Sequence, residues 1–250
     1  RGNMFKGLCL VFILSLTSIS ALASEKSICG ANDDRIVSFE NKIGRLYMDE
    51  SHKGCTVTMI SETCGISAGH CLPVLKYAEF NTPLSEEGQA QASDPRDMYP
   101  VIESSIKYQD EGPGKDWAVF KLGANSITGK LPGAVQGYHD VSFKRPSRGT
   151  TLRITGYGRD NDDPDKNFAQ QTNTGKLKTV GSIFFGSTML THTVDTMGGN
   201  SGSTIINEKT QEVIGVHTHG GCAVDGGSNK GTLISAHAEL KAAIRACLNN

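Results

Sequence analysis

Most of the chain after residue 40 consists of short runs of β-branched and other apolar residues, separated by glycine, proline and polar clusters. Runs of this length and composition predict β-strands rather than helices. Only AHAELKAAIRACL (236–248) has apolar residues spaced at three and four, which is the helical pattern. We therefore expect an all-β body closed by one C-terminal helix. The expected strands are CTVTMI (55–60), WAVFKL (117–122), TLRITGYG (151–158), GKLKTVGSIFF (175–185), TMLTHTV (188–194), STIINE (203–208) and EVIGVHTH (212–219).

The first residues have the features of an export signal. A charged start at 4–7 is followed by the apolar and small-residue run LCLVFILSLTSISALA (8–23). We expect a signal peptide over residues 1–23, with residues 1–3 as a leading extension. The alternative is a membrane anchor, but the strongly apolar part, Leu8 to Leu16, is far shorter than the roughly 20 residues that a spanning helix needs. The expected product is secreted, extracellular or periplasmic, and makes no membrane contact.

The net charge and the number of cysteines further restrict the class of protein. The formal net charge is −1, which argues against nucleic acid as the main partner. One of the seven cysteines, Cys9, lies in the expected signal peptide. An even number remains, and in an exported chain this favours disulfides over free thiols or a metal site. The remaining cysteines are Cys29, Cys55, Cys64, Cys71, Cys222 and Cys247.

Two polar stretches, 81–97 and 159–173, predict loops. The second stretch is acidic, and several carboxylates close together could hold calcium. The carboxylates lack the ordered spacing of a calcium-loop motif, so a solvated turn is the preferred interpretation. The residues concerned are Asp160, Asp162, Asp163 and Asp165.

The stretch VDTMGGNSGS (194–203) concentrates small residues around Ser201. Glycine is kept where the backbone must take conformations that other residues avoid. One such use is to aim backbone N–H groups at a developing negative charge beside a nucleophilic serine, and the alternative is an ordinary turn. Upstream, His70 precedes Cys71, and Asp116 opens the apolar run DWAVFKL. The order His70, Asp116, Ser201 is one of the orders in which hydrolytic triads occur.

These motifs resemble those of the chymotrypsin-like serine peptidases, and within them the bacterial glutamyl endopeptidases. The resemblance covers about residues 31–245 and implies two six-stranded antiparallel β-barrels with the active site in the cleft between them. It rests on SAGHC (67–71), DWAVFKL (116–122), GGNSGS (198–203), ANDDRIVS (31–38), ITGYG (154–158) and EVIGVHTHGG (212–221). The expected parts are an N-terminal segment at 24–35, a first barrel at 36–145, a second barrel at 146–235 and a helix at 236–250.

The same resemblance implies a role for each motif residue. His70 would be the general base and Asp116 would orient it, both from the first barrel, while Ser201 from the second barrel would be the nucleophile. The N–H groups of Gly199 and Ser201 would form the oxyanion hole. Asn200 stands where the animal enzymes keep an aspartate that binds a newly cut N-terminal amine, so activation of that kind is not expected. We expect protein or peptide substrates, no cofactor, no metal and a monomer.

Two signals conflict over which bond is cut. Asp195, six residues before the serine, lies where trypsin-like enzymes bind lysine or arginine. Thr196 and His217 lie where glutamyl endopeptidases hold a substrate carboxylate, and Asp195 could then support an imidazole. We expect cleavage after glutamate, or aspartate, with cleavage after lysine or arginine through Asp195 as the alternative. Two further alternatives are that His217 is a satisfied core histidine and that His217, His219 and Cys222 hold a metal, although their spacing is a weak metal signal.

The resemblance also implies how the cysteines pair. One pair matches the disulfide that closes the histidine loop, and the other four cysteines allow three pairings. In glutamyl endopeptidases the mature N-terminus lies beside the specificity pocket, which favours a link between Cys29 and the pocket wall. The expected pairs are Cys55–Cys71, Cys29–Cys222 and Cys64–Cys247.

Two other protein classes compete with this interpretation. An inactive binding module on the same fold usually lacks a triad member, and all three are present here. An esterase of a different fold would carry Gly-x-Ser-x-Gly at a strand-to-helix turn, whereas the residues after Ser201 continue as a strand.

Overall fold

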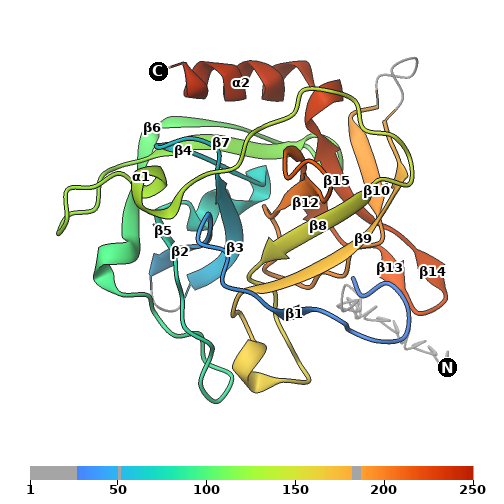
Figure 1. Ribbon diagram of the computed structural model, residues 1–250, viewed down its shortest axis with the longest axis horizontal. Helices are drawn as coiled ribbons and strands as arrows, with labels where there is room; N and C mark the ends of the chain where they lie inside the picture. Colours follow the sequence, from blue (N-terminus) through green and yellow to red (C-terminus); the bar gives the residue numbers. More distant parts are fainter. Residues whose placement is uncertain (1–26, 50–51, 182–186, 250) are drawn as a thin grey trace, which may run out of the picture.

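The computed structural model describes residues 27–49, 52–181 and 187–249, which form two β-barrels side by side (Figure 1). The expected signal peptide falls outside these residues. Within each barrel all strand pairs are antiparallel, and a single longer helix follows the last strand. The predicted fold class, two six-stranded β-barrels with a C-terminal helix, is therefore confirmed.

The first barrel is a closed sheet in the order β2-β3-β4-β7-β6-β5. Two neighbouring strands, β4 and β7, are buried along almost their whole length. Their inner side faces the barrel core, and the other side of β7 is covered by α2 and by the second barrel. Its strands are β2 (Ile43–Asp49), β3 (His52–Met59), β4 (Cys64–Ser67), β5 (Tyr77–Glu79), β6 (Met98–Asp110) and β7 (Asp116–Leu122).

The second barrel runs β9-β10-β15-β12-β11-β8 and closes because β9 also pairs with β8. Its core is built from inward-facing aliphatic side chains, including Leu152, Ile154, Leu190, Val194 and Ile205. Its strands are β8 (Thr151–Gly156), β9 (Gln171–Thr179), β10 (Met189–His192), β11 (Thr204–Asn207), β12 (Val213–His219) and β15 (Asn229–Leu233). A small hairpin of β13 (Cys222–Ala223) and β14 (Gly226–Gly227) lies beyond it.

Two boundaries differ from the sequence prediction. The expected first barrel began at residue 36, but β1 (Ile36–Val37) pairs with β9 of the second barrel, and the chain crosses to the first barrel only afterwards. Two residues are too few to show a period that would assign them to either sheet. The expected loop at 159–173 ends earlier, since β9 begins at Gln171. Gln171 and Thr172 are polar but buried, so composition alone misassigned them.

The C-terminal helix α2 (Ala238–Leu248) packs on β7 through its buried Leu240 and Ile244. It begins two residues later than predicted, because the His237 side chain caps it by accepting the Leu240 N–H at 3.3 Å. None of the helices in the described part of the chain is long and apolar enough to cross a bilayer. The shorter helices are α1 (Pro132–Gln136) and the 3₁₀ turns η1 (Gly69–Val74), η2 (Pro95–Asp97), η3 (Pro164–Lys166) and η4 (Ile234–Ala236).

Three disulfides cross-link the fold. One closes the loop between β3 and η1, one ties α2 to the first barrel, and one joins the N-terminal segment to the second barrel. They are Cys55–Cys71, Cys64–Cys247 and Cys29–Cys222, the same three pairs that the sequence analysis expects.

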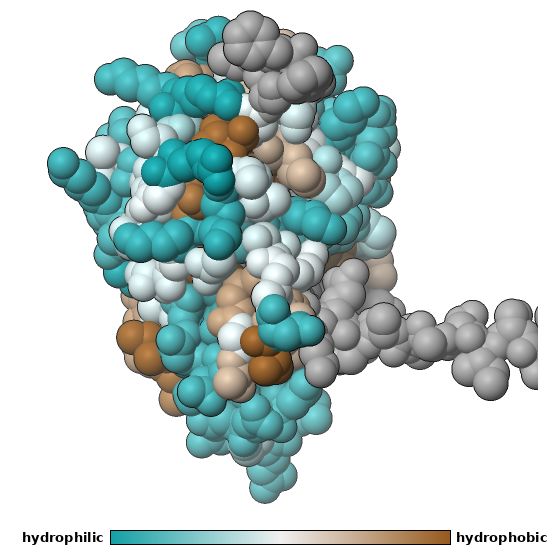
Figure 2. Space-filling view, turned by 90° about the vertical axis from the view of Figure 1, so that its right-hand side faces the viewer, coloured by the Kyte–Doolittle hydropathy of each residue, from teal (hydrophilic) through white to brown (hydrophobic). Residues whose placement is uncertain are grey.

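The face on the second-barrel side is mainly hydrophilic, with apolar residues in small separate patches (Figure 2).

Candidate active site

Asp116, the first residue of β7, is fully buried and faces the loop that carries His70. Its Oδ2 lies 2.6 Å from His70 Nδ1, and its Oδ1 accepts the backbone N–H groups of Gly69 at 2.6 Å and of His70 at 3.1 Å. An ionised carboxylate can only accept hydrogen bonds, so the imidazole proton lies on Nδ1. Nε2 of His70 therefore keeps its lone pair and can act as a base.

The position of this pair is fixed from both barrels. Thr232 of β15 donates its hydroxyl to the Asp116 carbonyl at 2.7 Å and accepts the Asp116 N–H at 3.3 Å. A Cβ on Gly69 would lie 2.0 Å from the Gln109 carbonyl oxygen, so only glycine fits before the histidine. His219, which the sequence analysis considered only as a metal ligand, has its Nδ1 3.8 Å from Asp116 Oδ2.

Ser201 lies in the turn before β11, against the loop that presents His70. Its carbonyl accepts the N–H of Thr56 on β3 at 2.8 Å, and Cys71 Sγ lies 3.8 Å from the same oxygen. The Cys55–Cys71 disulfide thus holds the histidine loop beside the serine turn. The three predicted triad residues are therefore brought to one place between the barrels.

The backbone before Ser201 is arranged to expose donors. The Gly198 carbonyl accepts the Arg159 N–H at 2.7 Å, and in a planar trans peptide the next N–H points the opposite way. Neither the Gly199 N–H nor the Ser201 N–H has an acceptor among the described residues. Gly199 has φ 103°, and a Cβ there would lie 2.3 Å from the Tyr157 carbonyl oxygen, so the turn requires glycine.

The side chain of Asn200 closes the same turn. Asn200 is buried, its Oδ1 accepts the Met197 N–H at 3.0 Å, and its own N–H donates to the Met197 carbonyl at 2.9 Å. These bonds hold the turn locally. This arrangement fits the expectation that no newly cut N-terminal amine is needed to form it.

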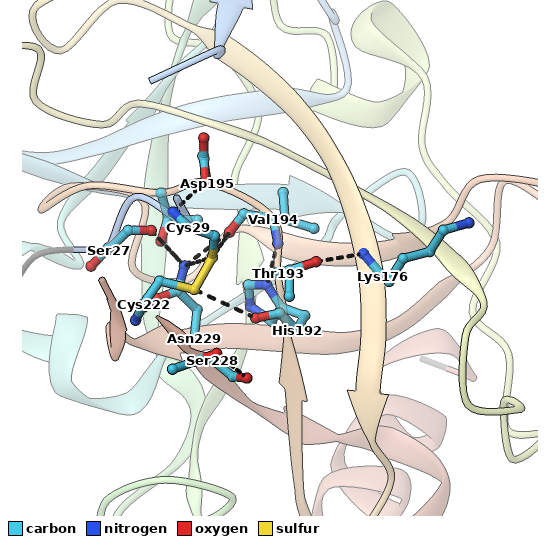
Figure 3. Close-up of a disulfide and its surroundings, with 12 residues drawn as sticks. Ser27, Cys29, Lys176, His192, Thr193, Val194, Asp195, Cys222, Ser228 and Asn229 are labelled. Atoms are coloured by element: carbon cyan, nitrogen blue, oxygen red, sulfur yellow. Dashed lines mark hydrogen bonds between the residues drawn. A yellow bond between two sulfur atoms is a disulfide. The ribbon is translucent and has the colours of Figure 1, made fainter. Parts of the chain in front are cut away.

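The predicted specificity residue Thr196 belongs to a buried cluster around Asn229. Figure 3 shows Asn229 beside Ser27 and the Cys29–Cys222 disulfide. The Asn229 amide donates to Thr196 Oγ1 at 3.2 Å and to the Ser27 carbonyl at 2.7 Å, and the Thr196 N–H also donates to the Ser27 carbonyl at 3.2 Å. Asn229 Nδ2 also donates to the Val194 carbonyl at 2.9 Å. Because an NH₂ group cannot accept, the Thr196 hydroxyl does not give its proton to Asn229, and this proton stays available for another acceptor. Asn229 was missed by the sequence analysis, because the polar run SNK has no motif around it.

The second predicted specificity residue, His217, is buried on β12, and its partner is another histidine. His192 Nε2 lies 3.2 Å from His217 Nδ1. Burial lowers the pKa of His217 well below its usual value, and the nearby His192 lowers it further. The ring is therefore neutral. His192 was also missed; the only signal is its place between Leu190 and Val194 on the buried face of its strand.

The sequence suggests that Asp195 could support an imidazole, but within the described residues its carboxylate accepts from the N-terminal segment. Its Oδ1 accepts the Cys29 N–H at 2.6 Å, and its carboxylate points away from His192 (Figure 3). Burial is the main reason that the pKa of Asp195 rises to about 6, and the neighbouring Asp34 raises it further. The side chain is thus engaged by the N-terminal segment.

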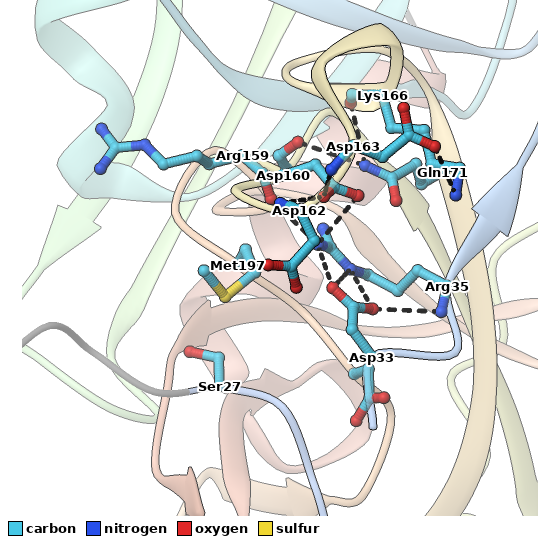
Figure 4. A network of polar contacts seen from close by, with 12 residues as sticks. Ser27, Asp33, Arg35, Arg159, Asp160, Asp162, Asp163, Lys166, Gln171 and Met197 are labelled. Atoms are coloured by element: carbon cyan, nitrogen blue, oxygen red, sulfur yellow. Dashed lines mark hydrogen bonds and ion pairs between the residues drawn. The ribbon is translucent and has the colours of Figure 1, made fainter. Parts of the chain in front are cut away.

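The acidic loop is neutralised by side chains of the chain itself (Figure 4). The Arg35 guanidinium lies 2.6 Å from Asp33 and 3.8 Å from Asp160, while Lys166 Nζ lies 3.0 Å from Asp163. These contacts favour the solvated turn over a calcium site. Within the described residues, the one cluster of metal-ligand side chains is His70 with two cysteines, and both sulfurs are already joined in a disulfide. The two cysteines are Cys55 and Cys71.

Comparison with known proteins decides the family. The family model described as Trypsin matches residues 31–239. The chain belongs to the trypsin family. As a trypsin-family member it is a serine endopeptidase, and the predicted resemblance to the chymotrypsin-like serine peptidases is confirmed.

Solved structures share the fold of this trypsin-family chain. A Glu endopeptidase in complex with MPD superposes with a TM-score of 0.65 at 20% identity, covering 89% of this chain and 100% of the other. A thermostable serine protease, AL20, from an extremophilic microorganism superposes with a TM-score of 0.60 at 15% identity, covering 84% and 99%. A search of the curated proteins found no match.

Proposed function

We propose that the chain is an exported serine endopeptidase that cleaves peptide bonds after glutamate, or aspartate, through Ser201, His70 and Asp116. The single observation that carries the proposal is the contact between Asp116 Oδ2 and His70 Nδ1 at 2.6 Å, beside a serine turn with two unengaged N–H groups. The three disulfides support export, because disulfides persist in oxidising compartments.

In the proposed mechanism His70 Nε2 takes the proton of Ser201 Oγ as that oxygen attacks the substrate carbonyl carbon. The resulting oxyanion accepts hydrogen bonds from the N–H groups of Gly199 and Ser201. His70 then gives the proton to the leaving amine, which departs and leaves an acyl-enzyme. Water attacks the acyl group with His70 again as base. Asp116 keeps the imidazole in the required tautomer and stabilises its cation throughout.

The preference for an acidic residue rests on Thr196 and His217. Both are buried, and the Thr196 hydroxyl keeps its proton for a substrate acceptor. A buried carboxylate must be hydrogen-bonded to avoid a large desolvation cost, and donors at this place would supply the bonds. Cleavage after lysine or arginine would need Asp195 to face the substrate, but its Oδ1 already accepts the Cys29 N–H.

The test combines active-site labelling with peptide substrates. A fluorophosphonate should label Ser201, and the Ser201→Ala and His70→Ala variants should each lose at least about a thousandfold in kcat/KM, because triad members act as a unit. Thermal unfolding of both variants should match the wild type. Absence of labelling and hydrolysis in the folded wild type would favour the inactive binding module. Faster cleavage of a lysine than of a glutamate peptide would favour the alternative specificity.

A further inference from the structure

His192 takes no part in the mechanism above, yet it lies directly behind the proposed specificity residue. It is the last residue of β10 and fully buried. Its ring centroid is 5.3 Å from that of His217 in an edge-to-face arrangement, with His192 Nε2 3.2 Å from His217 Nδ1.

The hydrogen bonds around His192 determine where its proton lies. The backbone N–H of Val194 donates to His192 Nδ1 at 3.2 Å. A backbone N–H can only donate, so Nδ1 must be the nitrogen with the lone pair. The proton of the neutral ring is then on Nε2, which faces His217.

The proton on His192 Nε2 also determines which nitrogen of His217 is protonated. Because His192 Nε2 carries the proton, it donates to His217 Nδ1, which must therefore be unprotonated. The proton of the neutral His217 ring is left on Nε2, the nitrogen that does not face His192.

Both rings are neutral in this arrangement. Burial lowers the pKa of His192 to about 3, and burial together with the neighbouring histidines lowers the pKa of His217 well below its usual value. The groups that act on His217 are His192 on β10, His219 on its own strand and His70 on η1. Each of these histidines, when it is protonated, opposes a positive charge on the His217 ring.

We propose that His192 is a positioning residue for substrate specificity. It holds His217 in the tautomer that carries its proton on Nε2, and this N–H donates to the side chain of the substrate residue before the cleaved bond. The inference rests on the proposed function, in which His217 and Thr196 receive that side chain. Two donors fit a carboxylate, whose oxygens both accept. They reject an amide, because its NH₂ group would face a donor.

Replacing His192 should therefore change the choice between glutamate and glutamine rather than activity as a whole. In a His192→Phe variant nothing donates to His217 Nδ1, so the ring can move its proton to Nδ1 and present a bare Nε2. A lone pair there repels a carboxylate and accepts an amide N–H. We expect the ratio of kcat/KM for matched Glu and Gln peptides to fall by at least about tenfold. Cleavage after glutamine should hold or rise.

The conservative variant is His192→Gln. Its amide can accept the Val194 N–H and donate to His217 Nδ1, as His192 does. We expect it to keep the Glu-to-Gln ratio within about threefold of the wild type. If His192 had only a structural role, His192→Phe would lower kcat/KM for the Glu peptide and for the Gln peptide by the same factor. This result would overturn the inference.

A second readout does not depend on activity or on the stability of a variant. In the full chain labelled with ¹⁵N-histidine, the His217 ring at pH 7 should show a protonated Nε2 and an unprotonated Nδ1. A proton on Nδ1, or on both nitrogens, would overturn the inference even if the wild type cleaves after glutamate. A wild type that shows the expected tautomer but no preference for glutamate would overturn the proposed function, and the specificity role with it.

Discussion

Asn229 Nδ2 donates to the backbone carbonyl of Ser27 at 2.7 Å, and so joins two residues that are 202 positions apart in the chain. The same amide donates to Thr196 Oγ1 at 3.2 Å, and its Oδ1 accepts the Cys222 N–H at 3.1 Å. One buried side chain thus connects the N-terminal segment, a disulfide and the proposed carboxylate site.

Replacing Asn229 should damage substrate binding as well as stability. In Asn229→Leu the buried Cys222 N–H loses its acceptor and the Val194 carbonyl loses a donor. Each unsatisfied buried group costs about 1–3 kcal/mol. We expect a lower free energy of unfolding and a rise of at least about tenfold in KM for a glutamate peptide.

Asn125 offers a matched control for Asn229. It is also buried, and its amide donates to the carbonyls of Pro95 and Met98 at 2.8 Å, outside the proposed site. Asn125→Leu should lower the free energy of unfolding by a similar amount while KM stays within about twofold. Equal effects of both variants on KM would show that Asn229 acts through stability alone.

The serine turn gives a second prediction. Gly199→Ala would place a Cβ 2.3 Å from the Tyr157 carbonyl oxygen at a φ of 103°, so the Gly199 N–H should turn away from the oxyanion. We expect kcat to fall by about a hundredfold or more. Gly198→Ala adds the same methyl group at the preceding residue, where a Cβ meets no atom within 4 Å. It should lower kcat far less than Gly199→Ala does. Equal kcat in both variants would remove Gly199 from the oxyanion hole.

Strands with a run of apolar or β-branched residues, and one marked helix, were predictable, but strands without such a run were not. The run VIGVHTH was identified and corresponds to β12. The four residues of β4 are all buried and show no alternation, and β6 is 13 residues long with a mostly exposed second half. Their pairing in the barrel, rather than their own sequence, makes them strands.

Some residues of the proposed site could likewise be identified from the sequence, and others could not. His70, Asp116 and Ser201 could be located because the chemistry places each in a recognisable local motif. His192 and Asn229 act through contacts with distant parts of the chain. They are neighbours across β10 and β15, which are paired only in the folded barrel. No local pattern marks such a contact.

Two of the disulfides allow a comparison at nearly equal loop length. Cys29–Cys222 and Cys64–Cys247 close loops with sequence separations of 193 and 183, so the chain-entropy model assigns each about 5 kcal/mol. Replacing either pair by serines should lower the free energy of unfolding by similar amounts. Only loss of Cys29–Cys222 should also raise KM, since that link holds Ser27 near Thr196. An equal rise of KM in both double variants would contradict a role of the N-terminal segment in the pocket.

Asp195 should make stability depend on pH. Its pKa is raised by burial from 3.8 to about 6. Between these values the unfolded chain releases the proton and the folded chain keeps it, so stability falls as pH rises from about 4 to about 6 and stays reduced above that. Asp195→Asn keeps an oxygen for the Cys29 N–H and removes the titration.

We expect the Asp195→Asn variant to be more stable than the wild type at pH 7.5 and to show a shallower change in unfolding free energy between pH 4 and 6. Denaturant titrations at a series of pH values measure both effects. Cleavage after glutamate should persist. A wild type that cleaves after lysine, and a variant that does not, would instead assign Asp195 to the substrate.

The sequences of the cleavage products test the proposed activity and specificity together. The protein, with Ser201→Ala as the control, is incubated with a denatured protein mixture, and the new C-termini are identified by mass spectrometry. We expect most new C-termini to be glutamate, with aspartate second, and the control to produce none of them. New C-termini at lysine or arginine, or a product set unchanged by Ser201→Ala, would contradict this expectation.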